Sequence, residues 1–353
     1  MLFARLPRVV LSLGMAALLG LLAVPARAVT IDWVTVGDPG NTADTTGDPN
    51  PAGAVADAFQ IMKYEWTNSQ YVDFLNTVDA SGTNPNSVYN ASMDSSVRGG
   101  ISFTFGSASG SKYAAKSNMG DKPVNFVTWF DAARVSNWLF NGSTGTSSTE
   151  TGAYTLNNAT SGNAPAVNPG ATFYIPTENQ WYKAAYYKGG STNAGYWTYA
   201  TQSDAVPTAV TAGLTGSGSS GSTGNYANYG RAAGWNGQNG NVTTVGTNGG
   251  ASAYGAFDMS GNVNEWNDLT GDAGSSRGLR AGSWFDAAST LSSPIRSSIN
   301  PSSEFVYYGL RLASPVPVPE PATSCMALAG LACGCWMLRR QKPAGGPRRS
   351  SLS

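Results

Sequence analysis

Two long stretches of small and polar residues limit how much regular structure this chain can form. Glycine, serine, threonine and asparagine dominate residues Asn141–Gly170 and Thr208–Tyr226. Segments of this composition bury too little apolar surface to form elements of their own. Because these stretches alternate with short apolar runs, the sequence predicts an irregular, loop-rich α+β domain with few helices and many short strands.

Three segments carry the start signal of a helix. Thr67–Gln70 and Thr177–Gln180 are Thr-x-x-Gln capping boxes, in which each side chain satisfies a free backbone N–H of the first turn. Thr128–Asp131 is a looser version that ends in aspartate. Strands are expected in the apolar runs before and between these helices. These runs are Ala58–Trp66, Ile101–Phe105, Pro123–Val127 and Ala171–Pro176.

The first 28 residues have the pattern of a signal peptide. A basic start precedes an apolar run from Val9 to Val24, and the segment closes with Ala26-Arg27-Ala28. Small residues at these two positions are typical of signal-peptidase sites, so we expect export and cleavage after Ala28. An uncleaved membrane anchor is the alternative.

The charge of the remaining domain argues against a nucleic-acid partner. Residues Val29–Ser314 contain 13 basic and 20 acidic residues, although the whole chain is formally neutral. Binding to phosphates needs a basic patch, and this composition predicts none. Few charges and many aromatic residues suit an extracellular setting.

Cysteine and histidine usage excludes several kinds of chemistry. The three cysteines are Cys325, Cys333 and Cys335, near the end of the chain, and there is no histidine. Catalysis by Ser-His-Asp or Cys-His groups is therefore excluded, as are histidine-ligated zinc, copper and iron sites. A loop-rich domain without disulfides favours a structural metal held through oxygen ligands.

The end of the chain resembles a PEP-CTERM sorting tail. The order is Val318-Pro319-Glu320-Pro321, then an apolar run from Cys325 to Leu338, then Arg339-Arg340. The run is shorter than the ~20 residues that span a bilayer unaided. The resemblance implies an exported protein of a Gram-negative bacterium, held transiently in the membrane and processed by an exosortase-type enzyme.

Six motifs together resemble the formylglycine-generating enzyme, or sulfatase-modifying factor, domain. They occur in the order found in that family and extend over most of the mature chain. The motifs are Tyr64–Asn76, Lys122–Leu139, Phe173–Tyr187, Ala253–Leu269, Arg280–Asp286 and Tyr308–Ser314. We therefore divide the chain into a signal peptide (1–28), an N-terminal extension (29–57), a sulfatase-modifying-factor-like domain (58–314), a sorting and membrane segment (315–343) and a basic tail (344–353).

The resemblance implies a modified C-type-lectin-like fold with bound calcium. The family's enzymes oxidise a sulfatase cysteine to formylglycine with two active-site cysteines, copper(I) and oxygen. The matching positions here are Asp286 and Leu291, after the Gly-Ser-Trp motif that ends at Trp284. Copper(I) favours thiolate ligands, which neither residue supplies. Copper is therefore not expected, and the absence of the two thiols favours a protein without the family's oxidase activity.

The same resemblance implies calcium ligands. One site corresponds to Asp258, the carbonyls of Gly261 and Val263, and Glu265, all oxygen donors that suit Ca²⁺. The first half of a second site matches Asn228 and the carbonyl of Tyr229. Its second half falls in Trp235–Asn241, which contains no carboxylate, so that site is expected to be weakened or lost. The alternative for Asp258 and Glu265 is a polar turn that faces water.

Four residues are candidates for lining the family's former active-site groove, namely Trp284, Asp286, Arg296 and Arg311. Core packing is the alternative for Trp284, and structural ion pairs are the alternative for the two arginines. We expect an exported, surface-associated binding or scaffold module whose partner is a glycan or protein of the cell surface or extracellular matrix. A sulfatase-modifying oxidase is the alternative function, and a hydrolase with paired carboxylates has no motif to support it.

Overall fold

All three predicted helices begin at their capping boxes. The computed structural model describes residues 29–316, so the signal peptide and the sorting tail lie outside the described residues. Helix α1 (Asn68–Val78), α3 (Trp129–Phe140) and α4 (Glu178–Tyr186) follow capping threonines, and both hydrogen bonds of each box are present. The aspartate version at the start of α3 is therefore as complete as the two glutamine versions.

One three-stranded antiparallel sheet joins the two ends of the described chain. Strand β2 (Phe59–Met62) lies between β1 (Trp33–Val36) and β11 (Ala313–Pro315). Gln60 is opposite Thr35 on one side and Ser314 on the other. The N-terminal extension thus contributes a strand to the same sheet as the last residues of the domain.

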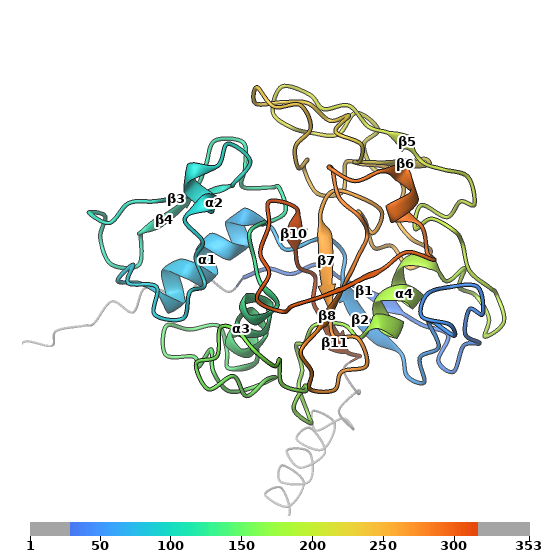
Figure 1. The fold of residues 1–353 in the computed structure, drawn as a ribbon, viewed down its shortest axis with the longest axis horizontal. Helices are drawn as coiled ribbons and strands as arrows, with labels where there is room; N and C mark the ends of the chain where they lie inside the picture. The colour runs from blue at the N-terminus through green and yellow to red at the C-terminus, as the bar shows by residue number, and fades with distance from the viewer. Residues whose placement is uncertain (1–28, 317–353) are drawn as a thin grey trace, which may run out of the picture.

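A four-stranded sheet lies at the centre of the molecule (Figure 1). Its order is β10-β7-β8-β9, in which β10 and β7 are parallel and the other neighbours are antiparallel. Its strands are β7 (Asn264–Asn267), β8 (Arg277–Arg280), β9 (Ser297–Ile299) and β10 (Tyr308–Gly309). In Figure 1, α1 and α2 lie on one side of this sheet and α4 lies on the other.

The remaining elements are small. They are α2 (Ser92–Ser95), the 3-10 helix η1 (Ala288–Leu291), the pair β3 (Ile101–Phe103) and β4 (Tyr113–Ala115), and the pair β5 (Thr208–Ala209) and β6 (Tyr226–Ala227). Two predicted strands, 123–127 and 171–176, are wrong, because each forms only a single bridge. Phe126 has a left-handed φ of 57°, which ends the first run, and Pro176 leads directly into the cap of α4.

Aromatic residues fill much of the core. The largest cluster packs α1 and α3 against β7, with Trp66, Trp129, Trp138 and Trp266 all buried. A second cluster surrounds Trp181 of α4. Within residues 29–316, no helix has both the length and the apolar character required to cross a bilayer.

Candidate functional site

A cavity of about 220 Å³ opens at the carboxyl end of β8. Its walls come from β7, from the segment between β8 and β9, and from the segment that leads into β10. Six of its lining residues are Asn264, Phe285, Asp286, Arg296, Tyr307 and Tyr308. Aromatic walls combined with a few polar groups are typical of ligand pockets.

A sharp turn after β8 places Asp286 in this pocket. Gly282 has a φ of +65°, and a Cβ there would lie 2.9 Å from the hydroxyl of Thr290, so any other residue would be strained. The Ser283 hydroxyl and the Asn264 amide donate hydrogen bonds of 2.7 and 3.1 Å to Asp286 Oδ2. Because Oδ1 accepts no hydrogen bond from a described residue, it can accept one from a ligand.

Three aromatic rings form a row that begins with Phe285 and Tyr307 in the pocket lining and continues to Phe305 outside it. Phe285 stacks on Tyr307 with ring centres 5.7 Å apart, and Tyr307 stacks on Phe305 at 5.6 Å. Phe285 and Phe305 are 42% and 48% exposed. Exposed apolar side chains that are contiguous, rather than scattered, mark interaction surfaces. We refer to Phe285, Tyr307 and Phe305 as the aromatic row.

The structure separates the four side chains predicted to bind in the groove. Asp286 and Arg296 line the pocket, and Arg296 also lies 3.3 Å from the carboxylate of Asp48. Trp284 is buried in a small core cluster. Arg311 is fully buried and forms an ion pair away from the pocket lining. Two of the four candidates are therefore positioned to contact a ligand in this pocket.

The two positions that match the active-site cysteines of the formylglycine-generating enzymes differ in their surroundings. Asp286 lines the pocket, whereas Leu291 is fully buried in a cluster with Tyr199 and Ala227. A Cβ on Gly282 would lie 3.0 Å from Leu291 Cδ1, so the leucine packs beneath the turn. A carboxylate and a buried alkyl group stand where a thiol pair would be needed.

A buried ion pair joins β7 to the end of the domain. Both carboxylate oxygens of Glu265 accept hydrogen bonds from Arg311, at 2.8 and 2.9 Å, and Oε2 also accepts one from the Trp181 indole at 2.7 Å. Arg311 donates further hydrogen bonds to the backbone carbonyls of Met62 and Phe257. One guanidinium group thus connects three other segments of the chain.

Two further buried carboxylates interact with this pair. Burial, and then the charges of Asp258 and Glu265, raise the pKa of Glu65 well above its ordinary value. Burial also raises the pKa of Asp258. Three acidic side chains therefore lie with the single guanidinium of Arg311 in a low-dielectric interior, where burial and mutual repulsion favour the protonated forms of Glu65 and Asp258. We call Glu65, Asp258, Glu265 and Arg311 the buried charge cluster.

Asn228, from the second predicted calcium site, lies against the first site. Its backbone carbonyl accepts a 2.8 Å hydrogen bond from Asn262 N–H, and a Cβ on Gly261 would lie 2.3 Å from that carbonyl oxygen. Its side-chain Oδ1 is buried and has no hydrogen-bond partner among the described residues. The carbonyl of Tyr229 accepts a hydrogen bond of 3.2 Å from Ala232 N–H.

The donor chemistry at Asp258 suits a hard cation. Asp258 accepts hydrogen bonds from Gly246 N–H and the Asn248 amide. The carbonyl oxygens of Gly261 and Val263 accept none from the described residues, and both residues are buried. Within the described part of the chain, no three acidic, histidine or cysteine side chains are placed to hold a metal together. A calcium ion here would therefore depend on carbonyl and amide oxygens as well as carboxylates.

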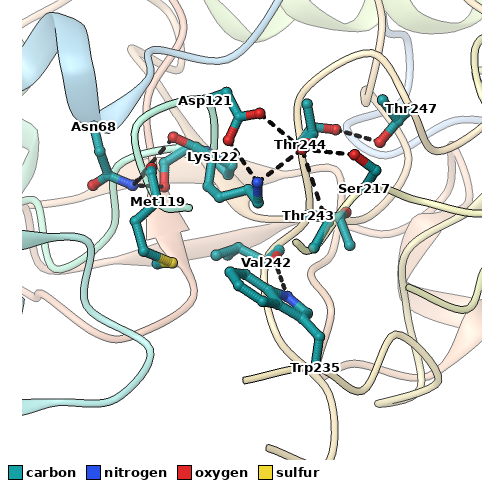
Figure 2. A network of polar contacts seen from close by, with 12 residues as sticks. Asn68, Met119, Asp121, Lys122, Ser217, Trp235, Val242, Thr243, Thr244 and Thr247 are labelled. Carbon is teal, nitrogen blue, oxygen red and sulfur yellow. Dashed lines mark hydrogen bonds and ion pairs between the residues drawn. The ribbon is translucent and has the colours of Figure 1, made fainter. Parts of the chain in front are cut away.

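A buried lysine fixes the loop that follows Asn228 (Figure 2). Lys122 Nζ donates hydrogen bonds to Asp121 Oδ1 at 2.5 Å and to Thr244 Oγ1 at 2.8 Å. It also lies 5.2 Å from the centre of the Trp235 ring. These contacts hold an irregular loop against the segment before α3, which compensates for the loop's lack of regular hydrogen bonding.

Glu65 lies within the motif Tyr64–Asn76, but no short motif indicates a role for its side chain. Its side chain accepts hydrogen bonds from the Asn262 amide at 2.7 Å and from Val263 N–H at 3.2 Å. The only local signal is a charged residue between two large aromatic residues, Tyr64 and Trp66, in an apolar run. A charge at such a position indicates a buried, partnered group.

A family model matches most of the chain. The sulfatase-modifying factor enzyme 1-like domain, of the FGE-sulfatase family, matches residues 25–316. The chain therefore belongs to this family, and the predicted irregular, loop-rich α+β fold of the formylglycine-generating-enzyme type is confirmed. Comparison with curated proteins gives no match.

Several solved structures are similar over most of their length. Treponema denticola variable protein 1 is 20% identical, with 80% of this chain and 95% of that chain covered and a TM-score of 0.42. CarF is 20% identical, with coverages of 81% and 99% and a TM-score of 0.47. PvdO from Pseudomonas aeruginosa is 16% identical, with coverages of 81% and 92% and a TM-score of 0.42.

Proposed function

We propose that this member of the family is an exported, surface-associated binding or scaffold module without oxidase activity. One observation carries the proposal: Asp286 lines the pocket and Leu291 is buried beneath it, at the two positions where the enzymes have thiols. Copper(I) requires soft ligands, which a carboxylate and an alkyl group do not provide. The pocket itself keeps an aromatic wall and free polar groups, which suits recognition of a ligand.

Binding can be tested with the full-length protein on arrays of glycans and peptides. We expect at least one class of ligand to bind, and we expect Asp286→Ala to weaken that binding because it removes the pocket's free acceptor. Asp272→Ala is the matched control, since Asp272 is exposed and does not line the pocket. Absence of binding to every glycan and peptide would contradict a binding function.

The alternative, a sulfatase-modifying oxidase, has its own test. The full-length protein is incubated with copper(I), oxygen and a peptide containing Cys-x-Pro-x-Arg, and the peptide is weighed by mass spectrometry. We expect no change relative to the same peptide with serine in place of cysteine. A mass loss corresponding to formylglycine would show that oxidation proceeds without the thiol pair.

We also propose that calcium stabilises this fold through Asp258, Glu265 and the carbonyls of Gly261 and Val263. The unpartnered Oδ1 of Asn228 and the carbonyls of Gly261 and Val263, which accept no hydrogen bond from the described residues, support a cation at this position. Glu265, whose two carboxylate oxygens bind Arg311, would have to exchange part of that contact for the ion. When bound, calcium would supply positive charge and fix the loops, with no part in a reaction. The site at Asn228 and Tyr229 is proposed to be weaker, since its second half lacks a carboxylate.

Removal of calcium is expected to destabilise the protein. A ligand that binds only the native state stabilises it by about 2.7 kcal/mol at a hundredfold excess over Kd. The melting temperature should therefore fall on chelation and recover with Ca²⁺. Asp258→Asn should reduce this response, whereas the exposed control Asp272→Asn should keep it. An unchanged melting temperature in chelator would argue against the site.

Export and transient membrane attachment complete the proposal. They rest on the sequence pattern of residues 1–28 and on the resemblance of residues 315–343 to a sorting tail processed by an exosortase-type enzyme. Cells that produce the full chain should hold the protein in the envelope or release a processed form. A chain without residues 317–353, which keeps all of β11, should be secreted without an envelope stage. Identical fractionation of the two chains would contradict a role for the tail.

A further inference from the structure

Two arginines beside the pocket have no carboxylate partner. Residues 29–316 contain seven arginines, and five of them form ion pairs with aspartate or glutamate. The other two, Arg98 and Arg231, form none with any described carboxylate. The domain contains more acidic than basic residues, so a lack of carboxylates does not explain why these two arginines are unpaired. The two guanidinium groups are thus available to an anion from outside.

Arg98 and Arg231 lie close together, on either side of Gly240. Arg98 Nε donates a 2.9 Å hydrogen bond to the Gly240 carbonyl. A Cβ on Gly240 would lie only 2.6 Å from the Cα of Arg231. Burial, and then the charge of Arg231, lower the pKa of Arg98. A bound anion would relieve the repulsion between these two groups.

Each guanidinium group also lies over an aromatic ring that leads to the pocket. Arg98 is 4.7 Å from the centre of the Trp284 ring, and Arg231 is 4.1 Å from that of Phe285. Phe285 lines the pocket and begins the aromatic row. Stacking holds the plane of each guanidinium group. The Arg231 guanidinium donates no hydrogen bond to a described residue, so it can bind a carboxylate through two parallel N–H groups. Arg98 donates from Nε and Nη2 to the carbonyls of Gly240 and Asn239, which leaves Nη1 for a carboxylate.

Building on the proposed binding function, we propose that this surface binds an acidic polysaccharide that carries uronate carboxylates. One sugar ring would occupy the pocket, and carboxylates of the chain would bind Arg98 and Arg231. A uronate sugar offers the three groups that the surface matches. Its carboxylate suits the arginines, its hydroxyls can donate to the free Oδ1 of Asp286, and its apolar ring face suits the aromatic row.

An acidic peptide matches this surface less well. Its side-chain carboxylates would pair with the two arginines, but it has no hydroxyl-bearing ring that could donate to Asp286 Oδ1 while its apolar face packs on the aromatic row. A neutral glycan would fit the pocket and the aromatic row but would leave both arginines without a partner. Only the acidic sugar uses every part of the surface.

The test measures binding of the full-length protein to three probes by calorimetry. These are an oligogalacturonate, its carboxyl-reduced neutral counterpart, and poly-glutamate. We expect the oligogalacturonate to bind more tightly than the other two, and its affinity to fall as salt rises. Arg98→Gln and Arg231→Gln should each weaken it about tenfold or more, because charge-assisted hydrogen bonds are about twice as strong as neutral ones. Arg231→Lys should recover only part of the affinity, since lysine lacks the planar fork.

Lys188→Gln is the matched control, because Lys188 also lies over an aromatic ring, 4.2 Å from the centre of Trp197, but does not line the pocket. It should bind like the wild type. Equal affinity for the acidic and neutral sugars, unchanged binding by both arginine variants, or equally tight binding of poly-glutamate would each overturn the acidic-polysaccharide proposal. If a glycan or peptide still bound in those cases, and Asp286→Ala weakened that binding, the proposed binding function would remain supported. Failure of the wild type to bind any glycan or peptide would remove both.

Discussion

Replacement of Arg311 by methionine tests whether the buried charge cluster governs the stability of this domain. The substitution keeps much of the side-chain volume but removes a guanidinium group that donates two hydrogen bonds to Glu265 and two more to backbone carbonyls. Glu265 would then be a fully buried carboxylate without its cation, close to Asp258 and Glu65.

The expected cost is large compared with the stability of an ordinary domain. Removal of one partner from a buried ion pair costs about 3–5 kcal/mol. Each of the two carbonyls that loses its donor adds about 1–3 kcal/mol. We therefore expect Arg311→Met to lower the free energy of unfolding by about 5 kcal/mol or more, near the lower end of the ~5–15 kcal/mol typical of native proteins.

Glu265→Gln should cost much less, although it breaks the same ion pair. The amide oxygen can still accept a hydrogen bond from Arg311, and the change removes one of the charges that raise the pKa of Glu65. We expect a loss of about 1–2 kcal/mol, mainly from the weaker hydrogen bonding. In the double variant, Glu265→Gln should recover part of the loss caused by Arg311→Met, because no unpaired charge is left at position 265.

Urea unfolding at neutral pH in the presence of a calcium chelator, followed by tryptophan fluorescence, provides the measurement, because calcium lost from the Glu265 variants would otherwise add to the difference. If Arg311→Met alone does not fold, recovery of folding in the double variant still reports the coupling. A loss of less than about 2 kcal/mol in Arg311→Met, or a loss in Glu265→Gln as large as that in Arg311→Met, would show that this cluster does not govern stability.

Two further predictions concern single buried positions. Burial raises the pKa of Asp131 to about 7. Between about pH 4 and pH 7 the folded state therefore keeps a proton on Asp131 that the unfolded chain has released. The free energy of unfolding should fall by up to roughly 4 kcal/mol as pH rises through this range. Asp131→Asn should remove this contribution and become more stable relative to wild type as pH rises, and a pH-independent difference in urea unfolding would contradict the assignment. Gly261→Ala should lower the melting temperature much more than Gly142→Ala. Both glycines have a φ of +93°, but only at Gly261 would the added Cβ clash with the backbone, 2.3 Å from the Asn228 carbonyl oxygen. Similar losses, near the ~1–2 kcal/mol of left-handed strain alone, would mean that the loop relaxes.

The helices could be predicted because their start signals are local. A capping box involves residues three positions apart, and the boxes at Thr67, Thr128 and Thr177 form as expected. The short strands were harder to predict, since an apolar run of four or five residues does not identify its partner. The run at 123–127 forms a bridge only at Pro123, whereas the unpredicted β1 forms a full ladder with β2.

The residues of the candidate site also differ in whether a local sequence signal could identify them. Asp286 could be singled out because it follows a recognisable Gly-Ser-Trp motif. The aromatic row and the two unpaired arginines could not, because they combine segments near residues 98, 231, 285 and 305. No short stretch of sequence indicates that a guanidinium group will lie over a ring some two hundred positions away.

The three-stranded sheet also determines how the domain would carry a mechanical load. Strands β1 and β11 are both antiparallel to β2 and therefore parallel to each other, with β2 between them. A force that pulls the start of β1 away from the end of β11 would act along the strands, and the hydrogen bonds of each ladder would have to break together rather than one after another. Tension applied between the two ends of the domain would thus be resisted in the sheet where it enters the fold.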